Sequence, residues 1–465
     1  MQGAIPMPGI SRLLTVVFTF VLMPSLALAA TSEALSEVRG FLEQTYSPDR
    51  PGASVVIMEK GEIVHQQGYG LANVELGVPI SPDTIFRVGS VTKQFTAAAI
   101  MLLQQRGELS INDPIGKYLP DYPTHGHQIT IEHLLTHTSG IMSYTNIPGY
   151  MDQEIRRDLT TEELIEVFEN QPMEFAPGDK WNYNNSGYVL LGAIIEAVSG
   201  QSYEDFIAEN IAGPLDLEST LYGGPKLIPN RASGYDTDDD GNIVNADFLS
   251  MTQPHAAGSL LSTTGDLVDW HKALTGGEFI HDESYELMTT PVGLNDDESY
   301  PYGFGLGISE LRGQRLIHHG GGIHGFSCYS LWLPDQDVYV AVLTNGATDG
   351  PGATTVAKMI AAMTIGDPYP DREAIDLSDQ DLQGLAGKFV GENFPPIEVT
   401  VEEKSITFDI GGFSTETVYA ESRNVLFMDD SLNHVEVEWD GDTASRLLFH
   451  LDEGVPPEIL QRQTE

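Results

Sequence analysis

Apolar positions early in the chain follow first a helical and then a strand period. Between residues 34 and 46 the apolar side chains recur at helical spacing. Residues 53–70 instead contain two strand-like runs on either side of a Lys60-Gly61 turn, the pattern of a β-hairpin. We therefore expect a sheet to begin close to the amino-terminal end of the fold.

Helical patterns dominate the centre of the chain. Residues 91–105 are apolar and rich in alanine, and residues 188–198 are apolar as far as Gly200, a residue that often ends a helix. Thr160 and Glu163 have the spacing of a capping box, in which each side chain binds the other residue's backbone N–H at a helix start. This part of the chain is predicted to be a largely helical insertion.

Strand patterns return late in the chain. They cover residues 325–333 and 338–345, with the polar turn 334–337 between them and a helical pattern at 354–364 behind them. Because strand patterns lie on both sides of the helical part, we predict an α/β protein of the α+β type. Its core would be one antiparallel sheet, closed by segments distant in sequence and flanked by helices.

The last part of the chain has a different composition. Residues 366–378 are rich in proline and aspartate, and from residue 382 to 463 short alternating runs are separated by turn signals. We predict a main domain over residues 30–368, a linker over 369–379 and a small all-β domain over 380–465.

The first residues have the features of an export signal. A single positive side chain, Arg12, precedes the apolar run 13–21 and the small-residue stretch 27–29. We predict a signal peptide over residues 1–29, cleavage after Ala29, and a periplasmic or secreted mature protein. An uncleaved membrane anchor is the alternative, since the apolar stretch is almost long enough to span a bilayer.

The chain is strongly acidic: it has 68 aspartate and glutamate residues against 23 lysine and arginine residues, a formal net charge of −45. Nucleic acids and anionic membrane surfaces would be repelled, so we expect a small-molecule or peptide substrate instead. Such an excess also suits high salt, where screening relieves self-repulsion. Cys328 is the single cysteine, so no intramolecular disulfide can form.

Three short strings contain residues able to catalyse acyl transfer, and the first holds a serine and a lysine. Ser90 and Lys93 lie three positions apart at an expected helix start, so one helical turn places both side chains on one face. The lysine amine could accept the serine proton there if its surroundings keep it uncharged. A serine that merely caps the helix is the alternative.

The second and third strings supply groups that would complete such a site. Tyr183, in a loop ahead of a helix, could relay a proton, and the Asn185 amide could bind both the lysine and a substrate carbonyl. An ordinary polar turn is the alternative there. Residues 318–326 are rich in glycine directly before a strand pattern, so a ligand could approach the backbone closely and bind exposed N–H groups.

In their order and separation, the three strings resemble the serine β-lactamase and DD-peptidase superfamily, in particular its class C-like hydrolase branch. Residues 129–140 (ITIEHLLTHTSG) and 175–179 (FAPGD) are similar to the same branch. The resemblance covers residues 34–364 and implies a β-lactamase/transpeptidase-like fold. The Ser-x-x-Lys, Tyr-x-Asn and His-x-Gly elements of that family are matched by Ser90 and Lys93, Tyr183 and Asn185, and His319 and Gly321.

The resemblance also implies roles for these residues. Ser90 would be the acylated nucleophile, with Lys93 and Tyr183 sharing the proton transfers in an order that the sequence leaves open. The N–H groups of Ser90 and Gly322 would bind the oxyanion. His319 stands where many relatives have a lysine, so its positive charge would be weaker and pH-dependent, and efficient β-lactam hydrolysis is not expected.

The residues that carry the resemblance predict a serine hydrolase acting on small peptides or amides, as a DD-peptidase or D-aminopeptidase does, with weak β-lactamase activity possible. A carboxylesterase and a catalytically degenerate binding or scaffold protein are the alternatives. The strand-rich end of the chain is similar to the lipocalin-like domains of some relatives. Such a domain would shape or cover the cleft, or would serve only for stability or oligomerisation.

Two groups of potential metal ligands have plainer interpretations. His133 and His137 lie four positions apart, but they belong to the string ITIEHLLTHTSG, which favours a structural role. Residues 236–247 partly match a calcium-binding loop, yet an acidic hairpin tip explains them as well. The chain has no GxSxG nucleophile elbow and no phosphate-binding GxxxxGK string. We therefore expect neither a metal ion nor a cofactor.

Overall fold

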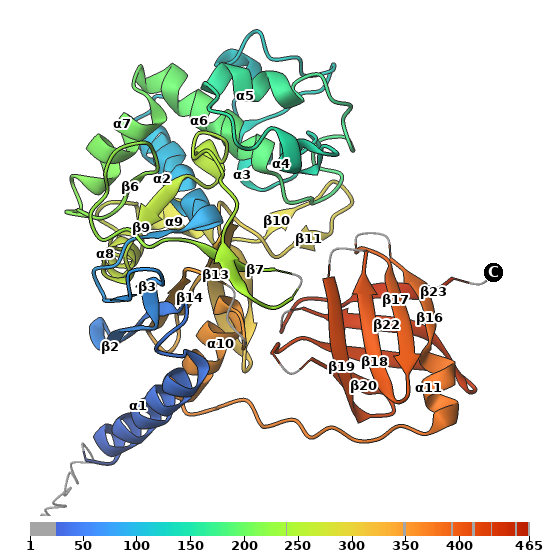
Figure 1. The fold of residues 1–465 in the computed structure, drawn as a ribbon. Helices are drawn as coiled ribbons and strands as arrows, with labels where there is room; N and C mark the ends of the chain where they lie inside the picture. Colours follow the sequence, from blue (N-terminus) through green and yellow to red (C-terminus); the bar gives the residue numbers. More distant parts are fainter. Residues whose placement is uncertain are drawn as a thin grey trace, which may run out of the picture.

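The structure is a computed structural model that describes residues 25–463 apart from 239, 347–349, 392–393, 412–413, 429 and 452. Figure 1 shows two units: a larger one of helices and strands, coloured blue to orange, and a barrel coloured orange to red. An extended segment connects the last helix of the larger unit to the barrel.

One antiparallel six-stranded sheet forms the centre of the larger unit, in the order β12-β13-β14-β15-β1-β2. β1 pairs with β15 from Ala53 opposite Thr344, so the first and last strands of the unit lie side by side. The predicted antiparallel sheet, closed by distant segments, is confirmed. Its strands are β1 Ala53–Glu59, β2 Glu62–Tyr69, β12 Gly307–Leu311, β13 Gln314–Ile323, β14 Phe326–Leu333 and β15 Val338–Thr344.

Both faces of this sheet are covered, which explains why its central strands β1 and β15 are almost entirely apolar. Val55 and Ile57 of β1 belong to one apolar core together with residues of α1 (Ser25–Thr45) and α10 (Ala353–Thr364). Val56 and Met58 point to the opposite face and join the larger core there, because successive side chains of a strand alternate.

A group of helices covers the opposite face of the sheet (Figure 1). Of these, α2 is buried from Thr92 to Leu103, so its start is held inside the unit. The group contains α2 Thr92–Gln105, α3 Ile131–Leu135, α4 Tyr150–Gln153, α5 Thr161–Phe168, α6 Asn185–Ser199, α7 Tyr203–Ile207, α8 Thr264–Thr275 and α9 Asp282–Met288. Short strands pair between them: β3 Leu71–Asn73 with β4 Val78–Pro79, β5 Phe86–Arg87 and β6 Leu221–Tyr222 with β9 Leu260–Ser262, β7 Tyr235–Thr237 with β8 Ile243–Asn245, and β10 Val292–Gly293 with β11 Ser299–Tyr300.

Side-chain caps fix two helix starts of this group. At α5, the Thr160 hydroxyl accepts from the Glu163 N–H and the Glu163 carboxylate accepts from the Thr160 N–H, so the predicted capping box is confirmed. At α6, the Asn184 side chain accepts from the Gly187 N–H at 2.8 Å. This cap starts α6 ahead of its apolar pattern and makes Asn185 the first residue of the helix.

The C-terminal unit is a closed eight-stranded barrel that follows helix α11 (Asp379–Leu385). Alternate side chains of its strands form a separate apolar core. The predicted small all-β domain is confirmed, and its closure through the pairing of Phe389 in β16 with Arg462 in β23 is a new finding. The strands are β16 Gly387–Val390, β17 Ile397–Glu402, β18 Ser405–Ile410, β19 Ser414–Ser422, β20 Val425–Phe427, β21 His434–Asp440, β22 Thr443–His450 and β23 Glu458–Arg462.

A loop of the barrel binds the edge of the six-stranded sheet. The Glu310 N–H in β12 donates to the Glu453 carbonyl at 2.8 Å, and the Arg312 N–H donates to the Glu453 carboxylate at 2.6 Å. The Tyr369 hydroxyl donates to the same carboxylate at 2.9 Å. Glu453 therefore joins the barrel, the sheet edge and the segment between the two units.

The predicted signal peptide falls mostly on residues 1–24, which lie outside the described residues. Helix α1 begins at Ser25, so the predicted cleavage point after Ala29 lies within it. Among the helices of the described residues, none is both long and apolar enough to span a membrane. The limits of the two domains and the linker stay predictions.

Candidate active site

Ser90 and Lys93 lie where a 3-10 turn becomes an α-helix. The turn covers Gly89–Val91 and runs into α2 at Thr92. It directs both side chains to the same side, and the Lys93 Nζ lies 3.1 Å from the Ser90 Oγ. The two groups are thus within hydrogen-bond distance.

The surroundings of Lys93 favour the uncharged form of its amine. The side chain is fully buried, and burial lowers the pKa of the amine well below its ordinary 10.5. Besides Ser90, its partners among the described residues are two carbonyl oxygens, Asn185 Oδ1 at 2.8 Å and Ala257 O at 2.9 Å. Carbonyl oxygens only accept, so they use both N–H groups of a neutral amine. The lone pair of Nζ is then left for the Ser90 hydroxyl proton.

Asn185 is oriented by two hydroxyl groups. Its backbone N–H donates to Ser143 Oγ at 3.2 Å, and its Nδ2 donates to Thr145 Oγ1 at 3.2 Å. Because the amide nitrogen is bound to Thr145, the amide oxygen is the atom that faces Lys93. Asn185 therefore holds the lysine in the orientation that a proton acceptor needs.

Tyr183 lies beside Lys93 and keeps its proton. The Lys93 Nζ lies 4.7 Å from the centre of the Tyr183 ring. Burial raises the pKa of Tyr183 well above the ordinary value of a phenol. A phenol in this state is a poor base but can donate a proton. Between the two residues, the structure favours Lys93 as the base.

A glycine-rich strand packs directly against the serine turn. A Cβ at Gly321 in β13 would lie 1.9 Å from the Val88 carbonyl oxygen, so only glycine fits at this position. Gly89 has a φ of +51°, and a Cβ there would lie 3.1 Å from the Gly322 N. The close approach places the Gly322 backbone beside Ser90 in the lining of one cavity, as an oxyanion hole requires.

His319 is a buried, neutral residue. Burial is the main cause that lowers the pKa of its imidazole to about 3. Its Nδ1 lies 2.6 Å from Gly320 O and its Nε2 lies 2.9 Å from the Tyr302 hydroxyl. Since the carbonyl oxygen only accepts, Nδ1 carries the proton and Nε2 accepts from Tyr302. The sequence led us to expect a positive charge weaker than that of a lysine at this position, and the lowered pKa of His319 is consistent with a neutral side chain near neutral pH.

Tyr302 connects His319 to a second buried imidazole, that of His137. The His137 Nδ1 accepts from the Asn184 N–H at 3.0 Å, and its Nε2 lies 3.2 Å from the Tyr302 hydroxyl. Burial lowers the pKa of His137 well below 6.5, so its proton sits on Nε2 and is donated to Tyr302. We call His137, Tyr302 and His319 the imidazole–tyrosine network. It ties strand β13 to the loop that carries Tyr183.

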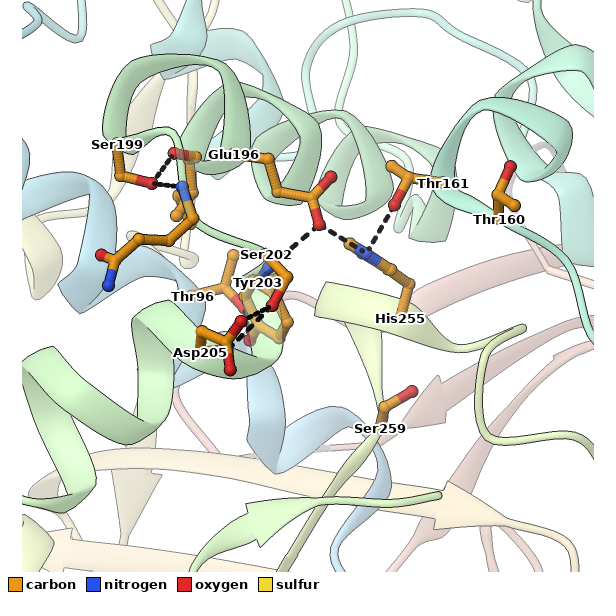
Figure 2. Close-up of polar contacts among 12 residues, drawn as sticks. Thr96, Thr160, Thr161, Glu196, Ser199, Ser202, Tyr203, Asp205, His255 and Ser259 are labelled. Atoms are coloured by element: carbon orange, nitrogen blue, oxygen red, sulfur yellow. Dashed lines mark hydrogen bonds and ion pairs between the residues drawn. The ribbon is translucent and has the colours of Figure 1, made fainter. Parts of the chain in front are cut away.

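A second buried cluster holds the turn that carries Ala257. Figure 2 shows His255, the first residue of this turn, between Thr161 of α5 and Glu196 of α6. The His255 Nε2 lies 3.2 Å from Thr161 Oγ1 and 3.8 Å from Glu196 Oε1. Both contacts use the same nitrogen, whereas a catalytic triad uses one nitrogen for each partner. The cluster therefore positions the turn, and with it the carbonyl that accepts from Lys93.

A cavity of about 280 Å³ opens beside Ser90. Among the described residues, its lining includes no carboxylate, lysine or arginine side chain. His324 also lies in the lining and the other lining residues are uncharged, so an uncharged group fits this space. Its apolar and aromatic lining residues are Tyr144, Met151, Ile155, Leu249, Pro254, Ala257 and Ile323.

A second cavity, of about 530 Å³, adjoins the site at Tyr183 and His319. Asn433 and Leu451 of the barrel also line it. The C-terminal barrel thus forms part of the wall of a cavity next to the candidate catalytic residues.

Both groups of potential metal ligands that the sequence suggested have other contacts. His133 Nδ1 accepts from the Thr130 N–H at 3.2 Å at the start of α3, and His137 belongs to the imidazole–tyrosine network. The segment 236–247 contains the tip of the β7–β8 hairpin, where the Asp238 carboxylate accepts from the Asn242 N–H at 2.8 Å.

Comparison with known proteins identifies the family. The family model described as Beta-lactamase matches residues 36–362, so the chain belongs to the β-lactamase family. A penicillin-binding protein of Bacillus subtilis (strain 168) is 29% identical over 421 residues, which cover 86% of this chain and 92% of that protein. The D-aminopeptidase of Gluconobacter oxydans (strain 621H) is 27% identical over 73% of this chain and 63% of that protein.

A solved structure similar to the chain includes both units. The octameric penicillin-binding protein homologue from Pyrococcus abyssi aligns with a TM-score of 0.65 and 28% identity, covering 92% of this chain and 100% of that one. Together with the family match, this shows the β-lactamase/transpeptidase-like fold with an added barrel. Relatives such as the D-aminopeptidase show that the family includes hydrolases.

Several residues that position the site have no recognisable sequence pattern. Ala257 contributes only a backbone carbonyl, and His255 and Glu196 are isolated polar residues in apolar segments. Tyr302 is the exception, because it precedes a Gly-x-Gly string in which a Cβ at Gly305 would lie 2.6 Å from the Lys93 carbonyl oxygen. The string Gly303-Phe304-Gly305 is therefore the sequence feature that could have indicated Tyr302 as part of the site.

Proposed function

We propose that the chain hydrolyses small amides or peptides through a covalent acyl-enzyme on Ser90. The observation that carries this proposal is the hydrogen bonding of Lys93. Two carbonyl acceptors occupy the N–H groups of a buried amine, which leaves its lone pair facing the Ser90 hydroxyl. No charged partner is needed to activate the serine in this arrangement.

The proposed reaction has two stages. Ser90 Oγ attacks the substrate carbonyl as its proton passes to Lys93 Nζ, and the N–H groups of Ser90 and Gly322 bind the oxyanion. The tetrahedral intermediate collapses when the bond to the leaving group breaks, and the leaving nitrogen receives a proton from the Tyr183 hydroxyl. Tyr183 regains a proton from Lys93. Water then attacks the acyl carbonyl with the same groups acting in reverse order.

The cavities suggest which substrates suit the site. The apolar cavity beside Ser90 would hold an uncharged acyl side chain of moderate size. His319 is neutral, so it provides no fixed positive charge for the carboxylate of a penicillin or of a peptide end. With a D-aminopeptidase among the relatives, we propose D-aminoacyl amides or short peptides as the preferred class, and only slow β-lactam hydrolysis.

A carboxylesterase is the second candidate. The same uncharged cavity would accept a simple acyl ester, and an alkoxide or phenolate leaving group needs less help from Tyr183 than an amine does. The two candidates therefore differ mainly in their dependence on Tyr183.

A substrate panel tests the proposal. Wild type and Ser90→Ala would be assayed with D- and L-aminoacyl p-nitroanilides, short-chain p-nitrophenyl esters and benzylpenicillin. We expect turnover of the D-aminoacyl anilide that disappears in Ser90→Ala, and a larger loss of anilide than of ester turnover in Tyr183→Phe. Ester turnover alone would establish the esterase. No turnover by folded wild type, or turnover retained in Ser90→Ala, would contradict the acyl-enzyme proposal and favour a binding protein.

We also propose that the protein is exported to the periplasm or secreted. The support is the charged, apolar and small-residue pattern of residues 1–29. Amino-terminal sequencing of the protein recovered outside the cytoplasm should begin at Ala30, whereas an intact Met1 would contradict the cleavage.

A further inference from the structure

Two histidines and a glutamate meet on the outer face of the barrel. His434 in β21 pairs directly with His450 in β22, and their rings stack with centres 4.4 Å apart. Glu436 follows His434 by two positions, so it points to the same face of the sheet. Their neighbours in the two strands, Val435 and Phe449 among them, fill the barrel core, which places the three polar side chains outside it.

The three side chains offer ligand atoms at short mutual distances. One nitrogen or oxygen from each of His434, Glu436 and His450 lies within 4.8 Å of the others. The His450 Nε2 lies 3.6 Å from the Glu436 Oε1, slightly too far for a good hydrogen bond. In a tetrahedral site with bonds of 2.0–2.2 Å, neighbouring ligand atoms lie about 3.3 Å apart. Small side-chain rotations would therefore suffice to bind one ion.

His450 has an unsatisfied polar atom in this cluster. Its Nε2 is buried and has no hydrogen-bond partner among the described residues. A buried polar atom without a partner destabilises the folded state. A cation bound to this nitrogen would remove that cost. The Glu436 side chain is about half exposed, which leaves a path for an ion from solvent.

The surroundings of the cluster suit a cation, because the half-exposed Glu436 carboxylate lies beside both imidazoles. The large negative charge of the chain also attracts cations.

We propose that His434, Glu436 and His450 bind one zinc-type divalent transition-metal ion on the barrel. Two imidazoles and one carboxylate suit Zn²⁺ and similar ions, whereas Ca²⁺ and Mg²⁺ prefer oxygen ligands only. Three protein ligands leave a fourth position for water. No spacing in the sequence indicates this metal site, because these residues come together only through the pairing of β21 with β22.

The position of the cluster indicates what the ion would do. Asn433 and Leu451, next to His434 and His450 in the chain, line the cavity that adjoins Tyr183 and His319. An ion bound across β21 and β22 would fasten the end of the barrel that forms this wall. The site is separate from Ser90, so it is independent of the proposed hydrolysis.

Calorimetric titration of the full-length protein with ZnCl₂, in excess Mg²⁺ to occupy acidic surface groups, tests the proposal. We expect one Zn²⁺ per chain with an affinity that falls by about 100-fold or more in His450→Gln and His434→Gln, since even losing a group that only orients a ligand costs about 10- to 100-fold. Glu438→Gln, on the same face of β21 and paired with Arg446, is the matched control and should bind like wild type.

A second readout keeps the proposal testable if a histidine variant folds poorly. Glu436→Gln changes a half-exposed side chain and should leave the fold intact while weakening Zn²⁺ binding. Co²⁺ bound by wild type should show the visible absorption of a four-coordinate site, and this should disappear in Glu436→Gln. No specific Zn²⁺ binding by wild type, or binding unchanged in all three variants, would overturn the proposal.

Discussion

The hydrogen bonds around Lys93 and Tyr302 in the cleft and the cluster on the barrel are both built from polar side chains, but they differ in how fully these polar atoms are paired. In the cleft, each hydrogen bond of Lys93 and of the imidazole–tyrosine network has a defined donor and acceptor supplied by the protein. On the barrel, the His450 Nε2 has no hydrogen-bond partner within the part of the chain that the structure describes. The cleft therefore needs no added ligand for its proton transfers, whereas the barrel cluster is arranged to receive one.

The two regions also differ in how burial acts on charge. Burial lowers the pKa of Lys93 and of His319 and so favours their neutral forms, which the proposed chemistry requires. On the barrel, a half-exposed carboxylate lies beside the two imidazoles. In the cleft, burial favours Lys93 as a base. On the barrel, the partly exposed Glu436 carboxylate favours the binding of a cation.

Replacing Lys93 would have the largest effect on the cleft. Lys93→Met removes the proposed base, so kcat/KM should fall by about 1,000-fold or more, as for other residues that act as a catalytic unit. Steady-state kinetics with the best substrate of the panel measures this. Lys272→Met, at an exposed position of α8, is the control and should retain activity. Activity within tenfold of wild type in Lys93→Met would show that another group is the base.

Adding one methyl group at the sheet edge should have the next largest effect. In Gly321→Ala the new Cβ would meet the Val88 carbonyl oxygen, so β13 must move away from Ser90. A displacement of about 1 Å in a catalytic site costs about 100-fold in rate. Gly293→Ala, where a Cβ has open space, should leave kcat unchanged. A fully active Gly321→Ala would contradict the close packing of strand and serine turn.

Much of this cleft could be predicted from the sequence, because its reacting residues lie in short local strings. Ser90 and Lys93 are one turn apart, and Asn185 follows Tyr183 closely, so their spacing alone predicts proximity. The partners that decide protonation could not be predicted. Ala257 offers a backbone carbonyl that any residue has, and Tyr302 reaches His319 only through the pairing of β12 with β13.

In the barrel, by contrast, the sequence predicts the strands but not their pairing. The alternating pattern of residues 382–463 predicts strands, but which strands close the barrel depends on long-range pairing such as that of β16 with β23. For the same reason the His434, Glu436 and His450 cluster was missed, since register brings His450 opposite His434. Sequence patterns locate sites made by one segment better than sites made by two.

Removing one hydroxyl from the imidazole–tyrosine network tests whether the cleft is as complete as its hydrogen bonds suggest. Tyr302→Phe leaves the His137 Nε2–H and the His319 Nε2 without partners. Each unsatisfied buried group costs about 1–3 kcal/mol, so we expect a loss of about 2–4 kcal/mol in the free energy of unfolding. Chemical denaturation measures it, with Tyr419→Phe in the barrel as the control. A loss below about 0.5 kcal/mol would mean that water or another side chain replaces the hydroxyl.

The smallest predicted effect is a pH-dependent one at the Glu196 cluster. Although burial opposes it, the nearby His255 side chain and the hydrogen bond from the Tyr203 N–H lower the pKa of Glu196 below its ordinary 4.5. Its ionised form therefore stabilises the fold above pH 4.5, and this contribution is lost as the pH falls through the lowered pKa. Glu196→Gln should cost about 0.5–1 kcal/mol at neutral pH, and the difference from wild type should vanish in acid. If the difference in the free energy of unfolding between wild type and Glu196→Gln grows as the pH falls, the ionised carboxylate does not stabilise the fold.

The most direct test of the central claim is the intact mass of the protein after reaction at Ser90. Wild type, Ser90→Ala and Lys93→Met would be incubated with a fluorophosphonate and, separately, with benzylpenicillin, then quenched and weighed by mass spectrometry. We predict a single adduct on wild type with the fluorophosphonate, slower labelling of Lys93→Met, and none on Ser90→Ala. An unlabelled but folded wild type, or an adduct that persists in Ser90→Ala, would contradict an acyl-enzyme on Ser90.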